Sequence, residues 1–236
     1  MHKSLIHIPL GYGGEIVEAT FLARPNRFLV EAQLGHEVVR AHLADRGRLR
    51  ETLVGGARIL LAHRPGPGRA TQYQAVGSYV GERLASIDTG LPNRLVEAAL
   101  RARAIVPYAA YPQVQREATV GHSRFDFLLS DGQARFLVEV KSAGLIIDGA
   151  ALFPDAPTDR GRRHVLELAA LAASGERTSV VFIAQGVASR VSMHRAIDPA
   201  FAEALEQARA AGVEVRGYSC PVTPQGITFG DEIEVV

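Results

Sequence analysis

The chain has 236 residues, of which 47% are hydrophobic and 22% are charged, a balance typical of a soluble globular protein. No run approaches the roughly 20 apolar residues of a membrane-spanning helix, and the first residues lack the apolar segment of a signal peptide. The single cysteine, Cys220, excludes an internal disulfide and favours a reducing compartment. We therefore expect a cytoplasmic protein without a membrane partner.

The net charge is only +1, but the basic residues are unevenly placed. Residues 1–88 carry eleven Lys or Arg against eight Asp or Glu, and ten of these eleven are arginine. Residues 89–236 carry the other fifteen basic and seventeen acidic residues. Arginine can bind phosphate through two parallel hydrogen bonds, so the first part is compatible with a nucleic-acid partner. The charge alone does not identify one.

The first third of the chain alternates short β-like runs with turns marked by glycine and proline. A single helical turn is expected near Arg48–Leu53. The predicted strands are Glu18–Leu22, Arg27–Gln33, Glu37–Leu43, Ala57–His63, Gln72–Val76 and Glu82–Ile87. This pattern indicates a small β-barrel of the OB type over residues 1–88, although other small β folds fit it as well.

From Leu91 onward the pattern becomes mixed α/β. Proline in the first turn predicts a helix from Pro92 to Ala104. The later predicted elements are the strands Ser123–Ser130, Arg135–Lys141, Thr178–Gln185 and Val213–Tyr218, and helices within Asp155–Ala173 and Asp198–Ala211. The last strand, helix and strand form a β-α-β unit, which implies a parallel pair. We expect an α/β domain with a mixed sheet over residues 89–236.

The most informative passage is a predicted hairpin over Ser123–Ser142. Asp131-Gly132 lies between two alternating apolar runs, a pattern that predicts a two-residue turn. Such a turn would place Phe127 opposite Phe136 across the ladder.

In that register Asp126, Glu139 and Lys141 share one face of the hairpin. Two carboxylates among apolar strand residues repel each other unless a cation lies between them, and oxygen ligands suit Mg²⁺ or Mn²⁺. Such an ion polarises a phosphodiester and lowers the pKa of a bound water. Lys141 would orient that water or stabilise charge that develops on the phosphate. The pattern therefore predicts Asp126, Glu139 and Lys141 as a catalytic set for phosphodiester chemistry.

The alternative is a solvent-facing Asp126 beside an ordinary surface pair of Glu139 and Lys141, worth about a few tenths of a kcal/mol. The run Phe136–Lys141 favours the metal site, because it has the composition of a buried strand, where unpaired charges are disfavoured.

Asp126 followed by Glu139-Val140-Lys141 resembles the PD-(D/E)xK nuclease motif. More specifically, the chain is similar to the sugar fermentation stimulation protein A family. The matching passages are Ala23–Phe28, Gly47–Leu49, Ser123–Leu129, Val138–Leu145 and Phe153–Leu168. The resemblance covers nearly the whole chain. It implies an OB-like domain followed by a PD-(D/E)xK nuclease-like α/β domain, in a DNA-binding regulator of sugar utilisation.

The same resemblance extends the expected metal site. It implies that Glu97, on the first helix, completes the acidic cluster, and that the backbone carbonyl of Val140 is a further ligand. Without the resemblance, Glu97 would be interpreted as an exposed helix charge.

Two groups of residues are candidates to bind nucleic acid. In the barrel, the expected phosphate contacts are Arg24, Asn26, Arg27, Arg46, Arg48 and Arg50. On the helix that follows Thr158, a candidate N-cap, they are Arg160 and Arg163. His164 is a further candidate in the nucleic-acid site, to bind substrate or water, but a lone histidine is more often structural. Local pairing of these helix arginines with Asp155 and Asp159 is an equally good explanation.

Base stacking is a weaker expectation. Phe28 is a candidate to stack on a base, but its place in an alternating strand favours a core position. The aromatic content of 6%, without tryptophan, argues against a rich stacking platform, so no single-strand preference is assigned.

Three functions remain open after the sequence alone. The first is a DNA-binding regulator, with double-stranded DNA as the partner. The second is a metal-dependent deoxyribonuclease, and the third is a metal-dependent binder of a sugar phosphate. A homodimer is compatible with each of the DNA-directed functions.

Overall fold

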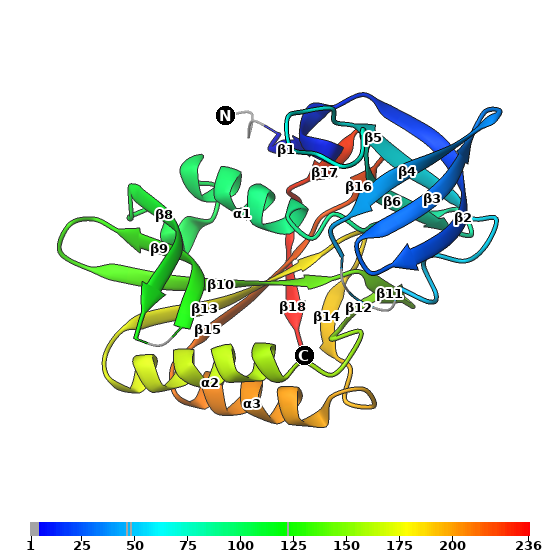
Figure 1. The fold of residues 1–236 in the computed structure, drawn as a ribbon. Coiled ribbons are helices and arrows are strands. Elements are labelled where there is room, and N and C mark those ends of the chain that lie inside the picture. The colour runs from blue at the N-terminus through cyan, green and yellow to red at the C-terminus, as the bar shows by residue number, and fades with distance from the viewer. Residues whose placement is uncertain (1–4, 46, 48, 122) are drawn as a thin grey trace. The chain divides into compact units, whose positions relative to one another are not determined.

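A computed structural model describes residues 5–45, 47, 49–121 and 123–236 of the chain (Figure 1). They form two compact units. The barrel unit contains His7–Leu91 and also Val222–Thr228, although the latter segment comes late in the chain. The sheet unit contains Pro92–Pro221 and Phe229–Val236, together with residues 5–6.

Six strands form the main sheet of the barrel unit, in the order β4-β3-β2-β5-β6-β7. A further parallel pairing of β4 with β6 closes β2 to β6 into a five-stranded barrel, which confirms the OB-like expectation. The strands are β2 (Ile16–Asn26), β3 (Leu29–Leu34), β4 (Glu37–Leu43), β5 (Arg58–His63), β6 (Tyr73–Val80) and β7 (Arg83–Ser86).

Alternate residues of the barrel strands fill its interior, because successive strand side chains point to opposite faces. Val30 and Ala32 in β3 are fully buried, as are Ala41 and Leu43 in β4. Thr52 and Leu53 both donate their N–H groups to the carbonyl of Leu49, so the expected helical turn is a hydrogen-bonded turn and not an α-helix.

A small second sheet completes the barrel unit, and the sequence did not predict it. Its strand order is β1-β17-β16. The strands are β1 (His7–Pro9), β16 (Val222–Thr223) and β17 (Gly226–Thr228), and the 3₁₀ turn η1 (Leu10–Gly13) follows β1.

Nine strands form the mixed sheet of the other unit, in the order β11-β12-β14-β18-β15-β13-β10-β9-β8. The β10–β13 and β13–β15 pairs are parallel, as the β-α-β pattern predicted for the latter. The strands are β8 (Gln113–Val120), β9 (Ser123–Ser130), β10 (Arg135–Ala143), β11 (Leu145–Ile147), β12 (Ala150–Phe153), β13 (Arg177–Ala184), β14 (Arg190–Met193), β15 (Glu214–Ser219) and β18 (Glu232–Val235).

Three α-helices cover this sheet. They are α1 (Leu91–Arg101), α2 (Asp159–Ala173) and α3 (Pro199–Ala210), and the 3₁₀ turn η2 (Val106–Tyr108) follows α1. The helices α2 and α3 lie together on one side of the sheet, and α1 lies on the other (Figure 1). Over the described ranges, none of the helices is long and apolar enough to cross a membrane.

Side chains at the helix starts fix where α2 and α3 begin. Thr158 accepts the N–H of Gly161 at 3.1 Å, which confirms the predicted N-cap. Asp198 caps α3 by accepting the N–H of Phe201 at 2.9 Å, and its other oxygen accepts the N–H of Thr158 at 2.8 Å. One carboxylate therefore joins the starts of the two helices.

The β9–β10 hairpin is present, but its turn differs from the prediction. Ser130 pairs with Arg135, so the loop has four residues, and Phe127 faces Val138 instead of Phe136. The predicted two-residue turn is therefore wrong. The cause is Asp131, whose Oδ1 accepts the N–H groups of two residues later in the loop and holds it open. A shift of two residues leaves each side chain on its expected face.

Candidate metal and nucleic-acid site

Asp126 lies where the β9–β10 ladder ends. The last paired residues of the two strands are Phe127 and Val138. Beyond them, the side chain of Asp126 replaces the β9 backbone as the hydrogen-bond acceptor for β10. Oδ2 of Asp126 accepts the N–H of Val140 at 2.8 Å. Oδ1 accepts the side-chain amide of Asn93, at the start of α1, at 2.7 Å. The carboxyl group is thus held between β10 and α1.

Glu139 lies on β10 and is 5% exposed. Its Oε1 accepts the Nζ of Lys141 at 2.6 Å and lies 2.8 Å from Nδ1 of His164 on α2. The side chains of Lys141 and His164 are also nearly buried. The other oxygen, Oε2, is buried and has no hydrogen-bond partner within the part of the chain that the structure describes.

The two carboxyl groups differ in their electrostatics. Burial, and after it the charge of Glu139, raises the pKa of Asp126 to about 6. The hydrogen bond from Val140 and the charge of Lys141 lower this pKa but do not outweigh the first two effects. Burial also opposes ionisation of Glu139, but the hydrogen bond from His164 and the charge of Lys141 outweigh it and lower the pKa of Glu139. The two carboxyl groups are therefore electrostatically coupled, and Glu139 ionises at a lower pH than Asp126.

The carboxylate pair offers oxygen ligands to a divalent ion, and the unsatisfied Oε2 of Glu139 is the atom that fits one best. The backbone carbonyl of Val140 belongs to the same stretch of β10. Glu97, in contrast, binds Arg101 through Oε1 at 2.9 Å and Arg116 through Oε2 at 3.1 Å. Among the described residues, no group of three or more His, Cys, Asp or Glu side chains is arranged to hold a metal.

The residues of α2 that were predicted to contact nucleic acid include exposed arginines and a buried histidine. Arg160 and Arg163 are exposed, and neither forms an ion pair with any residue that the structure describes. Arg162 does pair with Asp159, at 3.1 Å, as the local-pairing alternative expected. His164 is buried against Glu139 and Phe125, so it is part of the carboxylate cluster.

Of the barrel residues that were predicted to contact nucleic acid, some form hydrogen bonds within the barrel unit and others are exposed. Arg24 donates to the backbone carbonyls of Gly47 at 2.6 Å and of Asp45 and Arg27 at 3.2 Å, so it fastens the loop after β4. The exposed Arg27 lies over the ring of Phe28. Asn26 accepts the N–H of Phe28 in the β2–β3 turn. Arg50 is exposed, and the predicted contacts Arg46 and Arg48 fall outside the described residues.

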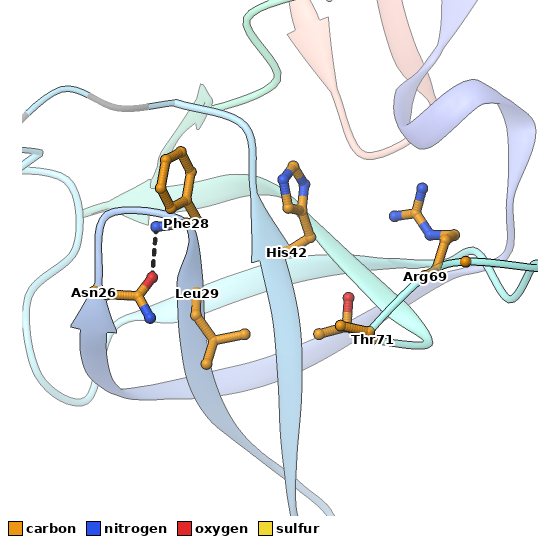
Figure 2. Close-up of a pocket in the computed structure, with 8 residues that line it drawn as sticks. Asn26, Phe28, Leu29, His42, Arg69 and Thr71 are labelled. Carbon is orange, nitrogen blue, oxygen red and sulfur yellow. Dashed lines mark hydrogen bonds between the residues drawn. The ribbon is translucent and has the colours of Figure 1, made fainter.

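Sequence reasoning missed two features of the site. Asn93 is 33 positions from Asp126 in the chain, and no local pattern connects the two. A cavity on the barrel was missed as well. It brings together β2, β3, β4 and the segment before β6, with a volume of about 410 Å³ (Figure 2). Its lining residues are Asn26, Phe28, Leu29, His42, Gly68, Arg69, Ala70 and Thr71. Phe28 is 38% exposed, so the core position favoured by the sequence is wrong.

The fold and the site define a class of protein. In this class an OB-like barrel is followed by a mixed-sheet α/β domain, which carries an Asp on one strand and Glu-x-Lys on the neighbouring strand. Comparison with known sequences names the family. Residues 90–226 match the family described as sugar fermentation stimulation protein RE domain, and residues 22–87 match the SfsA N-terminal OB domain. The chain belongs to the sugar fermentation stimulation protein family.

Relatives of similar length support the assignment. A sugar fermentation stimulation protein homolog from Chloroflexus aurantiacus is 51% identical over 236 residues, which cover 99% of this chain and 90% of the relative. A homolog from Moorella thermoacetica is 45% identical over 217 residues, which cover 91% of this chain and 94% of the relative. Among solved structures, SfsA of Pyrococcus furiosus in complex with Ca²⁺ matches with a TM-score of 0.86 and 31% identity, covering 97% of this chain and 99% of that one.

Proposed function

We propose that this protein is a DNA-binding regulator linked to sugar utilisation, with a divalent-cation site, for Mg²⁺ or Mn²⁺, at Asp126 and Glu139. The observation that carries the metal site is the buried Oε2 of Glu139, which has no partner among the described residues. The negative charge of the same Glu139 carboxylate also opposes the ionisation of Asp126. A cation would satisfy that oxygen and relieve the repulsion. A solved relative in complex with Ca²⁺ supports the proposal, because Ca²⁺ and Mg²⁺ both take oxygen ligands.

The surrounding residues have distinct roles in this proposal. Asp126, Glu139 and the carbonyl of Val140 would hold the ion, with waters as the remaining ligands. When bound, the ion would supply positive charge to a phosphate group of the DNA backbone. His164 fixes the side chain of Glu139 through its hydrogen bond to Oε1, so the free Oε2 keeps one orientation.

The DNA part of the proposal rests on exposed arginines. Arg160 and Arg163 at the start of α2 have no carboxylate partner in the described structure, so their guanidinium groups are available to phosphate. Arg27 on the barrel is exposed as well. Double-stranded DNA is the proposed partner, because phosphate contacts of this kind require no unpaired base.

A metal-dependent deoxyribonuclease is the second candidate. The observation that favours it is Lys141, which lies 2.6 Å from Glu139 with a side chain only 10% exposed. In a hydrolase, the Nζ of Lys141 would orient an attacking water or stabilise charge on the phosphate.

One assay separates the two candidates. Binding and cleavage of supercoiled, linear and single-stranded DNA are measured with Mg²⁺, Mn²⁺ or EDTA. The proteins are the wild type, Asp126→Asn, Lys141→Met and the control Asp159→Asn, which changes an exposed carboxylate on α2. Cleavage that needs the metal and is lost in the first two variants alone would make the nuclease the principal function.

Binding of DNA by all four proteins without cleavage would support the regulator. Absence of binding to every DNA form, with or without metal, would rule out both candidates.

A further inference from the structure

The proposed cation site has two carboxylates, which supply fewer oxygens than a divalent ion takes. Mg²⁺ accepts about six oxygen ligands and Ca²⁺ about six to eight. Among the described residues, no third His, Cys, Asp or Glu side chain completes a metal-binding group with Asp126 and Glu139. Glu97, which the family resemblance adds, has both oxygens bound by arginines. A further side-chain ligand therefore has to be a neutral group.

Asn93 is a neutral side chain that reaches this site. Its Nδ2 donates to Oδ1 of Asp126 at 2.7 Å, from a position near the start of α1. Asn93 lies four residues before Glu97, so the two side chains share one face of the helix. Helix α1 therefore brings an amide to Asp126 from the face on which the resemblance implies a carboxylate ligand.

The structure uses one half of this amide group. The nitrogen donates to Asp126, but the amide oxygen accepts no hydrogen bond from any residue that the structure describes. A half-turn about the Cβ–Cγ bond exchanges the nitrogen and the oxygen without moving the helix. Asn93 can therefore face Asp126 with a donor or with an acceptor.

The charge at the site decides which half of the amide is favoured there. Without a cation a donor is favoured, because it stabilises the buried carboxylate of Asp126 against the negative charge of Glu139. With a cation beside Asp126, the positive end of an N–H bond would face a positive ion and be repelled. An amide oxygen in the same place is instead one of the ligands that Ca²⁺ takes in proteins.

We infer that Asn93 is a ligand of the cation through its amide oxygen, which replaces the N–H group beside Asp126 when the ion binds. The inference rests on the proposed cation site and deepens it, because it gives α1 a ligand at a position that the resemblance did not indicate. The ligand set then holds two negative charges, from Asp126 and Glu139, which balance one divalent ion. The amide adds an oxygen without adding a charge that burial would oppose.

The test measures cation binding by the full chain with calorimetry, using Mg²⁺, Mn²⁺, Ca²⁺ and Cd²⁺. Asn93→Leu replaces the amide by an apolar group of similar size. Asn93→Cys replaces it by a thiol, which prefers the soft ion Cd²⁺ to Mg²⁺ or Ca²⁺ and gives a Cd²⁺–thiolate absorption band in the ultraviolet. The matched control is Ala98→Cys, which places the same thiol on another face of α1. The wild type sets the baseline, since its own Cys220 is buried.

Asn93→Leu is expected to bind Mg²⁺, Mn²⁺ and Ca²⁺ about tenfold more weakly than the wild type. Asn93→Cys should lose the same affinity for Mg²⁺ and Ca²⁺, bind Cd²⁺ more tightly than the wild type and show the thiolate band. Ala98→Cys should bind every ion as the wild type does and show no band. Thermal unfolding in EDTA checks that each variant is folded, and if Asn93→Leu is not, Asn93→Cys decides alone.

Unchanged affinity in Asn93→Leu would overturn the inference and leave Asn93 as a partner of Asp126 in the metal-free protein only. Weaker binding by Asn93→Leu without a thiolate band in Asn93→Cys would overturn it too, because Asn93 would then only orient Asp126. Failure of the wild type to bind any of these ions would instead overturn the proposed cation site, and the inference with it.

Discussion

Nδ1 of His164 lies 2.8 Å from Oε1 of Glu139, and both side chains are almost fully buried. This contact joins α2 to the central strand β10, and Lys141 donates to the same oxygen. A buried carboxylate that has two such partners stays ionised and keeps a fixed orientation. The arrangement leaves the second oxygen of Glu139 as the group in the cluster that still lacks a partner among the described residues.

Removal of the Glu139 carboxylate should destabilise the fold. We expect Glu139→Ala to lower the free energy of unfolding by about 3–5 kcal/mol, because Lys141 and His164 would lose their buried partner. Chemical denaturation at neutral pH measures the change. The comparison is Asp159→Ala, which breaks an exposed pair and should cost less than about 1 kcal/mol. A similar small cost for Glu139→Ala would mean that the cluster is hydrated and not buried.

The stability of the metal-free protein should depend on pH through Asp126. The pKa of this group is about 6 in the folded chain, against 3.8 for an ordinary aspartate side chain. Between these values the folded chain binds more protons than the unfolded chain, so this contribution to stability falls as pH rises. Above a pH of about 6 the penalty is complete, on the order of 1–3 kcal/mol.

Asp126→Asn should remove that penalty. Denaturation in EDTA at several pH values should show the wild type losing stability relative to Asp126→Asn from about pH 4 to about pH 7. The two proteins should behave alike at the acid end of the range. A constant difference across the range would show that Asp126 has an ordinary pKa.

Cation binding can be measured directly by calorimetry with Mg²⁺, Mn²⁺ or Ca²⁺. We expect Asp126→Asn and Glu139→Gln each to weaken binding by tenfold or more, because each removes charge from the only carboxylate pair in the proposed ligand set. Glu97→Gln should weaken it less, since both Glu97 oxygens are bound by arginines. An equal loss in all three variants would place Glu97 among the ligands, as the family resemblance implies.

The sequence predicted the face that Asp126 and Glu139 share better than it predicted the loop of the hairpin that carries them. The face of Asp126 and Glu139 depends only on alternation along each strand, which a loop longer by two residues does not change. The length of the loop depends on the hydrogen bonds that the Asp131 side chain accepts. The Asp-Gly pair in the sequence does not distinguish a loop held by such bonds from a two-residue turn. Asn93 is brought to Asp126 by tertiary packing, and a single sequence without homologues has no pattern that records such a contact.

Pairing of strands distant in the chain was equally hard to predict. The segment Val222–Thr228 joins the barrel unit through a pairing of β17 with β1, more than 200 residues away in the chain. Neither strand exceeds three residues, so neither shows a usable alternation. The barrel itself was predictable, because its strands are longer and glycine or proline marks the turns between them.

The arginines at the start of α2 give the last prediction. Arg160→Gln and Arg163→Gln should each weaken binding to duplex DNA about three- to tenfold and lower the slope of log affinity against log salt by about one. Arg162→Gln is the matched control on the same helix turn, because its guanidinium already binds Asp159 at 3.1 Å. Its affinity should stay within about twofold of the wild type, because its charge is already partly neutralised. Equal losses in all three variants would show a general charge effect and no defined phosphate contact at Arg160 and Arg163.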